Sequence, residues 1–573
     1  MKRALSLLLC LVLVCSLISG CAASKTAGRT HAWNADAEVR LSDASLQSDF
    51  VCQDNDRVFY EIFVGSFSDS DGDGTGDLRG VISRMDYLND GDPDSGKSLG
   101  VEGIWLTPVF SSPSYHKYDV TDYYTIDPAF GTEDDLRELC ELCEARNVKL
   151  ILDLPLNHTG AQNAWFTAFT AAHRSGSTDD PYYDFYSWCP SDSIPAGRTF
   201  RPIDGTNDSY ECNFSGDMPE LNFDSEAVRA ETLAIAKYWL ERGVDGFRFD
   251  AVKYVYLGDH GANAGFWQWY MDELRALDND IYTVAEVWDT DGVTDQYYSA
   301  LNCFDFTLSQ AEGLIAKAAA GSGVDKLTGY VESYLARVRS LRGDAAIVPF
   351  ISNHDMDRAA GFLPVTNGRM KMAANLYLLG PGSPFLYYGE ELGVKGSRGS
   401  SNTDANRRLA MPWGDGDAVS DPPGADYPEG NRLKTTAAEQ IADPGSLYTY
   451  YKTLLMIRHA NPEIARGEYR AVEGSGKLGG FVSEWEGSAV CVLHNASTNE
   501  QNFDLSSIGG HDFSVLAASI GQGDAVLDGS VLTLGPQTSA VLREGYTQTK
   551  QPRWGAQNRD TAAQKGFFRA GLR

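Results

Sequence analysis

The chain has 573 residues, of which 43% are hydrophobic and 11% aromatic, so it can bury a large core and form roughly two to four domains. The formal net charge of −31 argues against nucleic acid as a partner, because phosphate binding requires a concentrated basic surface. These values leave a folded protein whose partners are neutral molecules or cations.

The N-terminus has the order of a secretion signal. Lys2 and Arg3 precede an apolar run over residues 4–18, and small residues then lead to Cys21. This order resembles a bacterial lipoprotein signal, which implies lipidation of Cys21 and an extracytoplasmic protein attached to the membrane through its lipid only. The alternatives are an ordinary signal peptide cut nearby and an uncut anchor, although about fifteen apolar residues are few for a bilayer. The implied segments are a signal peptide (1–20) and a polar tether (21–50).

Short apolar, β-branched segments then alternate with helical stretches, which is typical of strands buried on both faces of a parallel sheet. Eight of them predict an α/β fold, a (β/α)8 TIM barrel over residues 51–158 and 220–465. The expected strands are Val58 to Val64, Gly103 to Leu106, Lys149 to Leu154, Gly246 to Phe249, Tyr282 to Glu286, Phe304 to Leu308, Ile347 to Ile351 and Phe385 to Tyr388.

Three further regions are expected outside the barrel. Residues 159–219, after the third strand, are too long for an ordinary loop and predict an inserted subdomain. Strand-like alternation over residues 466–545 predicts a C-terminal antiparallel β-sandwich domain. The basic tail over residues 546–573 is predicted to be disordered rather than to bind nucleic acid or a surface.

Carboxylates and histidines follow four of the expected strands. Because chemistry in a βα barrel takes place where the strands end, these residues predict an active site. A lone Asp or His at a strand end is usually a cap, but four coincident strand ends make chance a poor explanation. The segments are Asp153-Leu154-Pro155-Leu156-Asn157-His158, Gly246-Phe247-Arg248-Phe249-Asp250, Ala285-Glu286-Val287-Trp288 and Ser352-Asn353-His354-Asp355.

These four segments resemble, in order, the motifs of the α-amylase family, glycoside hydrolase family 13, and the resemblance extends from about Arg57 to about Arg458. It implies retaining hydrolysis of an α-glucan through a covalent intermediate. Asp250 is implied to be the nucleophile, Glu286 the general acid and base, and Asp355 the third carboxylate, which holds the distorted sugar ring. The implied substrate-binding residues are Tyr118, His158, Arg248, Lys253, His354, Asp404 and Arg408.

An acidic segment, Asp69 to Asp77, places carboxylates at alternate positions between glycines, a pattern that suits oxygen ligation of calcium. An EF-hand is excluded because Gly80 stands where the bidentate Glu would be. The segment resembles a family loop that binds structural calcium, and a solvated acidic turn is the alternative. The implied ligands are Asp69, Asp71, Asp73, Asp77 and the Thr75 carbonyl, with Asn157 corresponding to a ligand of a second calcium in some relatives.

The preferred bond is indicated by Ala251, since relatives that cut α-1,6 bonds tend to carry Val after the nucleophile. Tyr254, where amylases often have His, and the segment Met218 to Asn222 leave pullulan or cyclodextrin cleavage open. We therefore expect endo-hydrolysis of α-1,4 bonds in starch or maltodextrin. The alternatives are an exo-acting α-glucosidase, a neopullulanase or cyclomaltodextrinase-like enzyme and, more distantly, a non-catalytic glucan-binding protein. The oligomeric state does not follow from the sequence.

Overall fold

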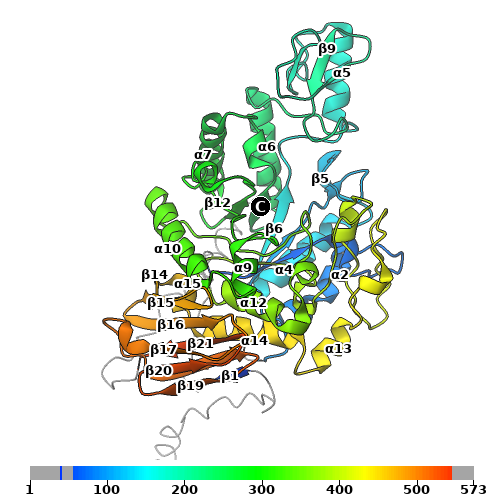
Figure 1. The fold of residues 1–573 in the computed structure, drawn as a ribbon. Helices are drawn as coiled ribbons and strands as arrows, with labels where there is room; N and C mark the ends of the chain where they lie inside the picture. Colours follow the sequence, from blue (N-terminus) through cyan, green and yellow to red (C-terminus); the bar gives the residue numbers. More distant parts are fainter. Residues whose placement is uncertain (1–38, 42–55, 94, 545–573) are drawn as a thin grey trace, which may run out of the picture.

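The protein is represented by a computed structural model, which describes residues 39–41, 56–93 and 95–544. At its centre is a curled parallel sheet of seven strands in the order β12-β11-β10-β6-β3-β2-β13. This arrangement confirms the expected barrel class, and Figure 1 shows the helices around the sheet. The strands are β2 (Phe59–Ile62), β3 (Gly103–Leu106), β6 (Lys149–Leu154), β10 (Gly246–Phe249), β11 (Tyr282–Ala285), β12 (Asn302–Cys303) and β13 (Phe385–Tyr387).

Two expected strands differ from the structure. The sixth, expected at 304–308, is the short β12, because the Asp305 carboxylate accepts from Thr307 N and the chain turns there. The seventh, expected at 347–351, is not a regular strand, since Pro349 has no N–H to donate. It nevertheless fills the gap between β12 and β13. Asp305 N donates to Val348 O, and Phe385 N donates to Pro349 O, each at 3.0 Å.

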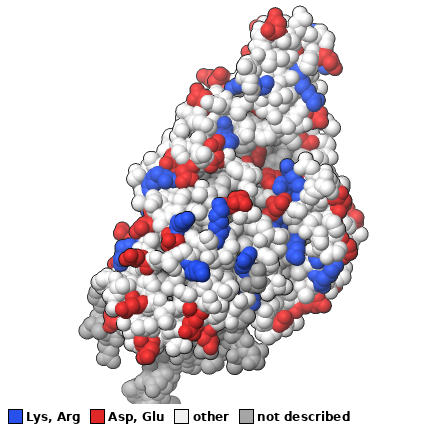
Figure 2. Space-filling model, in the orientation of Figure 1, with Lys and Arg blue, Asp and Glu red and all other residues white. Residues whose placement is uncertain are grey.

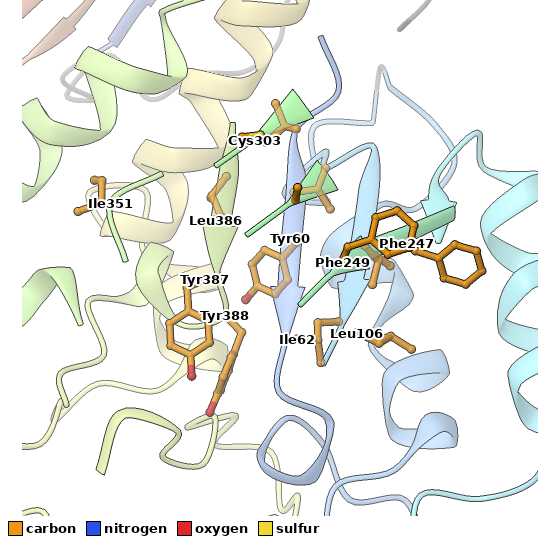
Figure 3. Packing of buried hydrophobic residues seen from close by; sticks show 14 of the residues in the cluster. Tyr60, Ile62, Leu106, Phe247, Phe249, Cys303, Ile351, Leu386, Tyr387 and Tyr388 are labelled. Carbon is orange, nitrogen blue, oxygen red and sulfur yellow. The ribbon is translucent and has the colours of Figure 1, made fainter. Parts of the chain in front are cut away.

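The helices cover the barrel with their apolar faces. In α4 (Glu133–Ala145), Leu136, Leu139, Cys140 and Cys143 are buried at helical spacing, so both cysteines belong to the packed face of this helix. Figure 3 shows side chains of the strands that pack toward this layer, among them Tyr60, Leu106 and Phe247. The other long helices are α6 (Glu226–Leu240), α7 (His260–Leu277), α10 (Val324–Leu341), α12 (Arg369–Leu378) and α14 (Leu447–Ala460).

Between β6 and α6 the chain forms a lobe that projects from the barrel (Figure 1). It contains α5 (Ala164–Ser175) and an antiparallel sheet in the order β7-β9-β8. Isolated bridges, His158 with Glu220 and Tyr186 with Leu221, join the two ends of this lobe at the barrel rim. The sheet strands are β7 (Trp188–Pro190), β8 (Phe200–Pro202) and β9 (Asp208–Glu211).

After α15 (Glu463–Arg466) the chain forms an antiparallel domain of two sheets, ordered β1-β18-β21-β16-β15-β14 and β17-β20-β19. Its own apolar core includes Leu493, Leu532 and Leu542. Val39–Leu41, within the expected tether, forms β1 and pairs with β18. The other strands are β14 (Glu468–Ala471), β15 (Leu478–Trp485), β16 (Ser488–Asn495), β17 (Gln501–Asp504), β18 (Val515–Gly521), β19 (Ala525–Asp528), β20 (Val531–Leu534) and β21 (Thr538–Arg543).

Cys21, most of the expected tether and the tail over residues 546–573 lie outside the described residues. Among the described helices, none has both the length and the apolar character needed to cross a membrane. On the face shown in Figure 2, basic side chains are interspersed with acidic ones.

Candidate active site

The barrel interior changes from apolar to charged along single strands. Side chains alternate between the two faces of a strand, so residues two positions apart both point into the barrel. Phe59, Ile151 and Val284 belong to a buried apolar cluster, together with Trp105, Phe304, Phe350 and Phe385. Two residues further along the same chains come Glu61, Asp153 and Glu286. The charged groups therefore gather at the C-terminal ends of the strands.

Arg248 on β10 binds three carboxylates. Its Nη1 donates to both oxygens of Asp153, at 2.8 and 3.0 Å, and to Asp250 Oδ1 at 2.7 Å. Its Nη2 donates to Glu286 Oε2. The Arg248 side chain is 1% exposed, and a guanidinium keeps its charge when buried. One fixed cation thus brings the predicted nucleophile and the predicted acid onto neighbouring nitrogens of the same group.

The two predicted catalytic carboxylates differ in their surroundings. Burial raises the pKa of Glu286 to about 7, and the nearby Asp250 carboxylate adds to the rise while Arg248 opposes it. Asp250 is followed by Ala251, whose φ of +53° lies in the left-handed region that a residue with a Cβ rarely adopts. Such strain is typical of functional sites, and here it directs the chain away from β10 directly after Asp250.

His354 lies in a chain of polar contacts across the barrel. Its Nδ1 is 2.5 Å from Glu61 Oε1, and its Nε2 is 2.7 Å from the Tyr118 hydroxyl and 3.2 Å from Asp355 Oδ2. Tyr118 in turn donates to Asp153 Oδ2 at 2.8 Å. Burial lowers the pKa of His354, but the carboxylates of Asp355 and Glu61 outweigh it and raise the pKa to about 10.

Asp355 is held from two sides. Arg408 Nη2 donates to its Oδ1 at 2.7 Å, while Arg408 Nε donates to the carbonyl of His354 at 3.1 Å. Although burial acts to raise its pKa, His354 and Arg408 hold the pKa of Asp355 well below its usual range. The Asp355 carboxyl is therefore ionised at neutral pH, and its side chain is 38% exposed, so it can meet a ligand.

His158 is 2% exposed, and neither of its ring nitrogens has a hydrogen-bond partner within the described part of the protein. A buried polar atom without a partner costs about 1–3 kcal/mol, so this ring is a candidate to bind a polar group from outside the protein. The ring of Phe214, which is 45% exposed, lies 5.3 Å from His158. An exposed aromatic face beside unpaired polar atoms suits a sugar.

Three of the predicted substrate-binding residues form contacts with other protein groups. Tyr118, expected to bind the substrate, has its hydroxyl bound to Asp153 and its ring stacked on His354. Lys253 Nζ donates to Trp288 O at 2.7 Å and to Asp289 at 2.9 Å. Asp404 pairs with Arg398 and Arg407, and it reaches the site through Arg407, which donates to the Asp355 carbonyl.

Two charged residues of the site carried no assigned role in the sequence interpretation. Glu61 is 1% exposed and Asp153 is fully buried. The signal for both was a carboxylate that directly follows apolar residues within a strand, as in FYEI and in the LILDL part of KLILDL. A buried charge needs partners, so such a residue predicts a polar network even without a motif.

The predicted calcium loop partly converges. Asp69, Asp71 and Asp77 each place one carboxylate oxygen within 4.8 Å of the others, and Asp73 is not part of this group. Three carboxylates around one point are a donor set that fits a hard cation such as calcium. Asp77 also caps α2 (Leu78–Ser83) by accepting from Gly80 N, so it has a structural role as well.

Comparison with known proteins gives consistent matches. The family model described as "Alpha amylase, catalytic domain" matches residues 61–467. "Alpha-amylase 3" of Dictyoglomus thermophilum is 36% identical over 78% of this chain and 86% of its own length. A "4-alpha-glucanotransferase" of Thermotoga neapolitana is 33% identical over 61% of this chain and 74% of its own. The structure of Eubacterium rectale Amy13B superposes with a TM-score of 0.80 at 34% identity, covering 88% of this chain and 99% of that one.

Proposed function

This chain belongs to the α-amylase family of glycoside hydrolases, and from that premise we propose that it hydrolyses α-1,4-glucosidic bonds within starch and maltodextrins, with retention of configuration. The observation that carries the proposal is the Arg248 centre. It holds Asp250 and Glu286 on one guanidinium, while burial gives Glu286 a pKa of about 7. A retaining glycosidase requires two neighbouring carboxyl groups, one that attacks and one that can donate a proton, and the raised pKa of Glu286 suits it to the second role.

In the first step the Asp250 carboxylate attacks the anomeric carbon, and Glu286 gives its proton to the departing glycosidic oxygen. The products are a glycosyl ester on Asp250 and a shortened glucan. In the second step Glu286 takes a proton from water, whose oxygen attacks the same carbon and releases Asp250. The raised pKa keeps Glu286 protonated for the first step at mildly acidic to neutral pH.

The remaining polar groups hold the sugar ring. Asp355 is ionised and partly exposed, so it accepts hydrogen bonds from sugar hydroxyls and favours the positively charged, distorted ring of the transition state. His158 supplies unpartnered ring nitrogens for the same sugar, and Phe214 adds an apolar face. Lys253, whose Nζ donates to Trp288 O, contacts the leaving part of the glucan in this proposal.

Endo-action on α-1,4 bonds is supported by the small Ala251 beside the nucleophile and by the relatives named as α-amylases. Relatives named as a glucanotransferase and a cyclomaltodextrinase keep transfer and ring opening as alternatives. The bond and chain-length preference must therefore be tested on separate substrates.

We further propose that the Asp69–Asp77 loop binds a structural calcium ion and that a lipid on Cys21 anchors the enzyme outside the cell. The loop proposal is supported by the three converging carboxylates. The anchor proposal is supported by the N-terminal sequence only. If it is correct, Cys21→Ser will move the protein from the membrane to the soluble fraction, and unchanged fractionation would contradict it.

The test of activity is product chromatography over time on starch, pullulan, maltotriose and isomaltose in separate reactions. We expect an early ladder of α-configured maltooligosaccharides from starch and no product from isomaltose. Glucose as the sole early product would instead identify an exo-glucosidase. No product from any substrate would support the glucan-binding alternative.

A further inference from the structure

Glu61 is a charged residue in a strand that is otherwise apolar and wholly buried. Its side chain lies among the ends of the parallel strands, opposite Trp105 on β3 and Tyr387 on β13. A buried carboxylate is costly unless a charged or hydrogen-bonding partner compensates for it. The partner of Glu61 is His354, which donates to Glu61 Oε1 from both Nδ1, at 2.5 Å, and the backbone N, at 3.2 Å.

The hydrogen-bond directions around His354 are determined by its neighbours. The Tyr118 hydroxyl has one proton, which it donates to Asp153 Oδ2 at 2.8 Å. Its oxygen, 2.7 Å from His354 Nε2, therefore accepts from that nitrogen. Nε2 also lies 3.2 Å from Asp355 Oδ2, a second acceptor. With Nδ1 facing the Glu61 carboxylate, both ring nitrogens carry a proton, and His354 is an imidazolium.

We propose that Glu61 is a positioning residue of the reaction, which keeps His354 doubly protonated and oriented so that its Nε2–H holds Asp355 and Tyr118 in place at the cleavage site. The proposal rests on the proposed function and deepens it, since Asp355 is the carboxylate expected to bind the distorted sugar. Glu61 itself does not touch substrate. It acts through the charge and the fixed plane of the imidazole ring.

The charges facing His354 show why Glu61 matters. Burial opposes protonation of the ring, and the two carboxylates in direct contact, Asp355 and Glu61, together raise the pKa of His354 to about 10. Without Glu61, Asp355 would be the remaining carboxylate in direct contact with the ring. The charged and titratable groups around the ring are Glu61, Asp153, Asp355, Glu286, Tyr118, Arg248 and Arg408.

The kinetic test is Glu61→Gln, which keeps the shape and an acceptor oxygen for Nδ1–H but removes the charge. At low pH the ring of His354 can take its second proton from solution without Glu61. We therefore expect the wild-type to variant ratio of kcat/KM to grow by about tenfold or more between pH 5 and pH 8. Because Asp355 acts mainly in the transition state, kcat should fall more than KM rises.

A matched control is Glu102→Gln. Glu102 also pairs with a histidine, His459, at 3.0 Å, but it directly precedes β3 and so lies at the opposite end of the barrel. This variant should lose stability with a kcat/KM ratio that does not change with pH. A pH-independent loss in Glu61→Gln would show a merely structural role and overturn the proposal.

A second measurement needs neither catalysis nor a folded Glu61 variant. The chain has nine histidines, so ¹⁵N-histidine NMR of the wild-type protein can follow each ring, with His354→Gln assigning the signal. We expect the His354 nitrogens to keep imidazolium shifts from pH 6 to pH 9. Titration of that ring near pH 6.5 would overturn the proposal. An inactive wild type that retains the imidazolium signal would instead overturn the proposed function and leave the Glu61–His354 pair standing.

Discussion

The barrel interior has two layers that are built from the same strands but differ in chemistry. The lower half is apolar, and the upper half, at the C-terminal ends of the strands, is charged. In the lower half, Phe59 packs against Tyr282 and Phe385 with ring centroids 4.3 and 4.7 Å apart, in a layer of apolar side chains. In the upper half, two residues further along, Glu61, Asp153 and Arg248 are as deeply buried but belong to a charged network. The comparison teaches that burial alone does not define a core. The apolar layer stabilises the fold, and the charged layer uses that rigid support to hold ionised groups away from water.

The largest expected effect is at the nucleophile. Asp250→Asn keeps the shape of the upper layer but removes the attacking carboxylate, so kcat should fall by about 10⁴-fold or more, measured by release of reducing sugar from starch. The control is Asp245→Asn, at the other end of β10, where the carboxylate accepts from Leu150 N. That variant should keep its activity. Wild-type turnover by Asp250→Asn would contradict the proposed role.

Glu286 provides the next largest effect and a pH dependence. Because its raised pKa of about 7 keeps it protonated, the group can donate its proton below that pH and loses this ability as the pH rises. The kcat/KM of the wild type should therefore fall as pH increases through about 7. Glu286→Gln, which cannot act as an acid, should lower kcat by about 10²- to 10⁴-fold and lack this alkaline decline. If Glu286→Gln shows the same alkaline decline as the wild type, the decline is caused by a group other than Glu286.

Substitutions in the apolar lower layer should reduce the stability of the fold and leave the activity of the folded enzyme unchanged. Phe59→Ala removes a fully buried ring, and we expect a loss of about 3–5 kcal/mol in the free energy of unfolding, measured with urea, with kcat of the folded enzyme unchanged. Leu341→Ala, at a side chain that is 46% exposed, is the control and should change stability by about 0.5 kcal/mol or less. If Phe59→Ala lost activity without losing stability, the division between the layers would be wrong.

The smallest effect is expected outside the barrel interior, at the Asp69–Asp77 loop. If calcium binds there and is present at about 100 times its Kd, it stabilises the folded protein by about 2–3 kcal/mol, and chelation should remove that stabilisation. We expect a lower melting temperature in EDTA and little change in the rate at low temperature. Asp77→Asn should lower the melting temperature and reduce its response to EDTA, whereas the exposed Asp134→Asn should behave as wild type. A melting curve insensitive to EDTA in the wild type would contradict the calcium proposal.

Much of the fold was open to prediction because it depends on local patterns. Apolar, β-branched runs such as Lys149–Leu154 predicted buried strands. The helical stretches expected between the strands include α4, which buries Leu136, Leu139 and Cys143 at helical spacing. The segment at 347–351 was predicted as a strand because its side chains are apolar. Its hydrogen bonding depends on Pro349 and on the neighbours on both sides, which the residue pattern does not contain.

The sequence by itself determined the set of chemical groups: which carboxylates, histidines and arginines follow the strands, and that their pattern resembles one family. Only the tertiary structure decided how those groups are paired, because Arg248, Glu61 and Tyr118 come from segments far apart in the chain and meet only when the sheet curls. The same closure excludes water, and this burial raises the pKa of Glu286. It also brings His354 and Arg408 against Asp355, and their charges lower the pKa of Asp355 although burial opposes them. Residue types are local information, whereas proton affinities depend on the whole folded barrel.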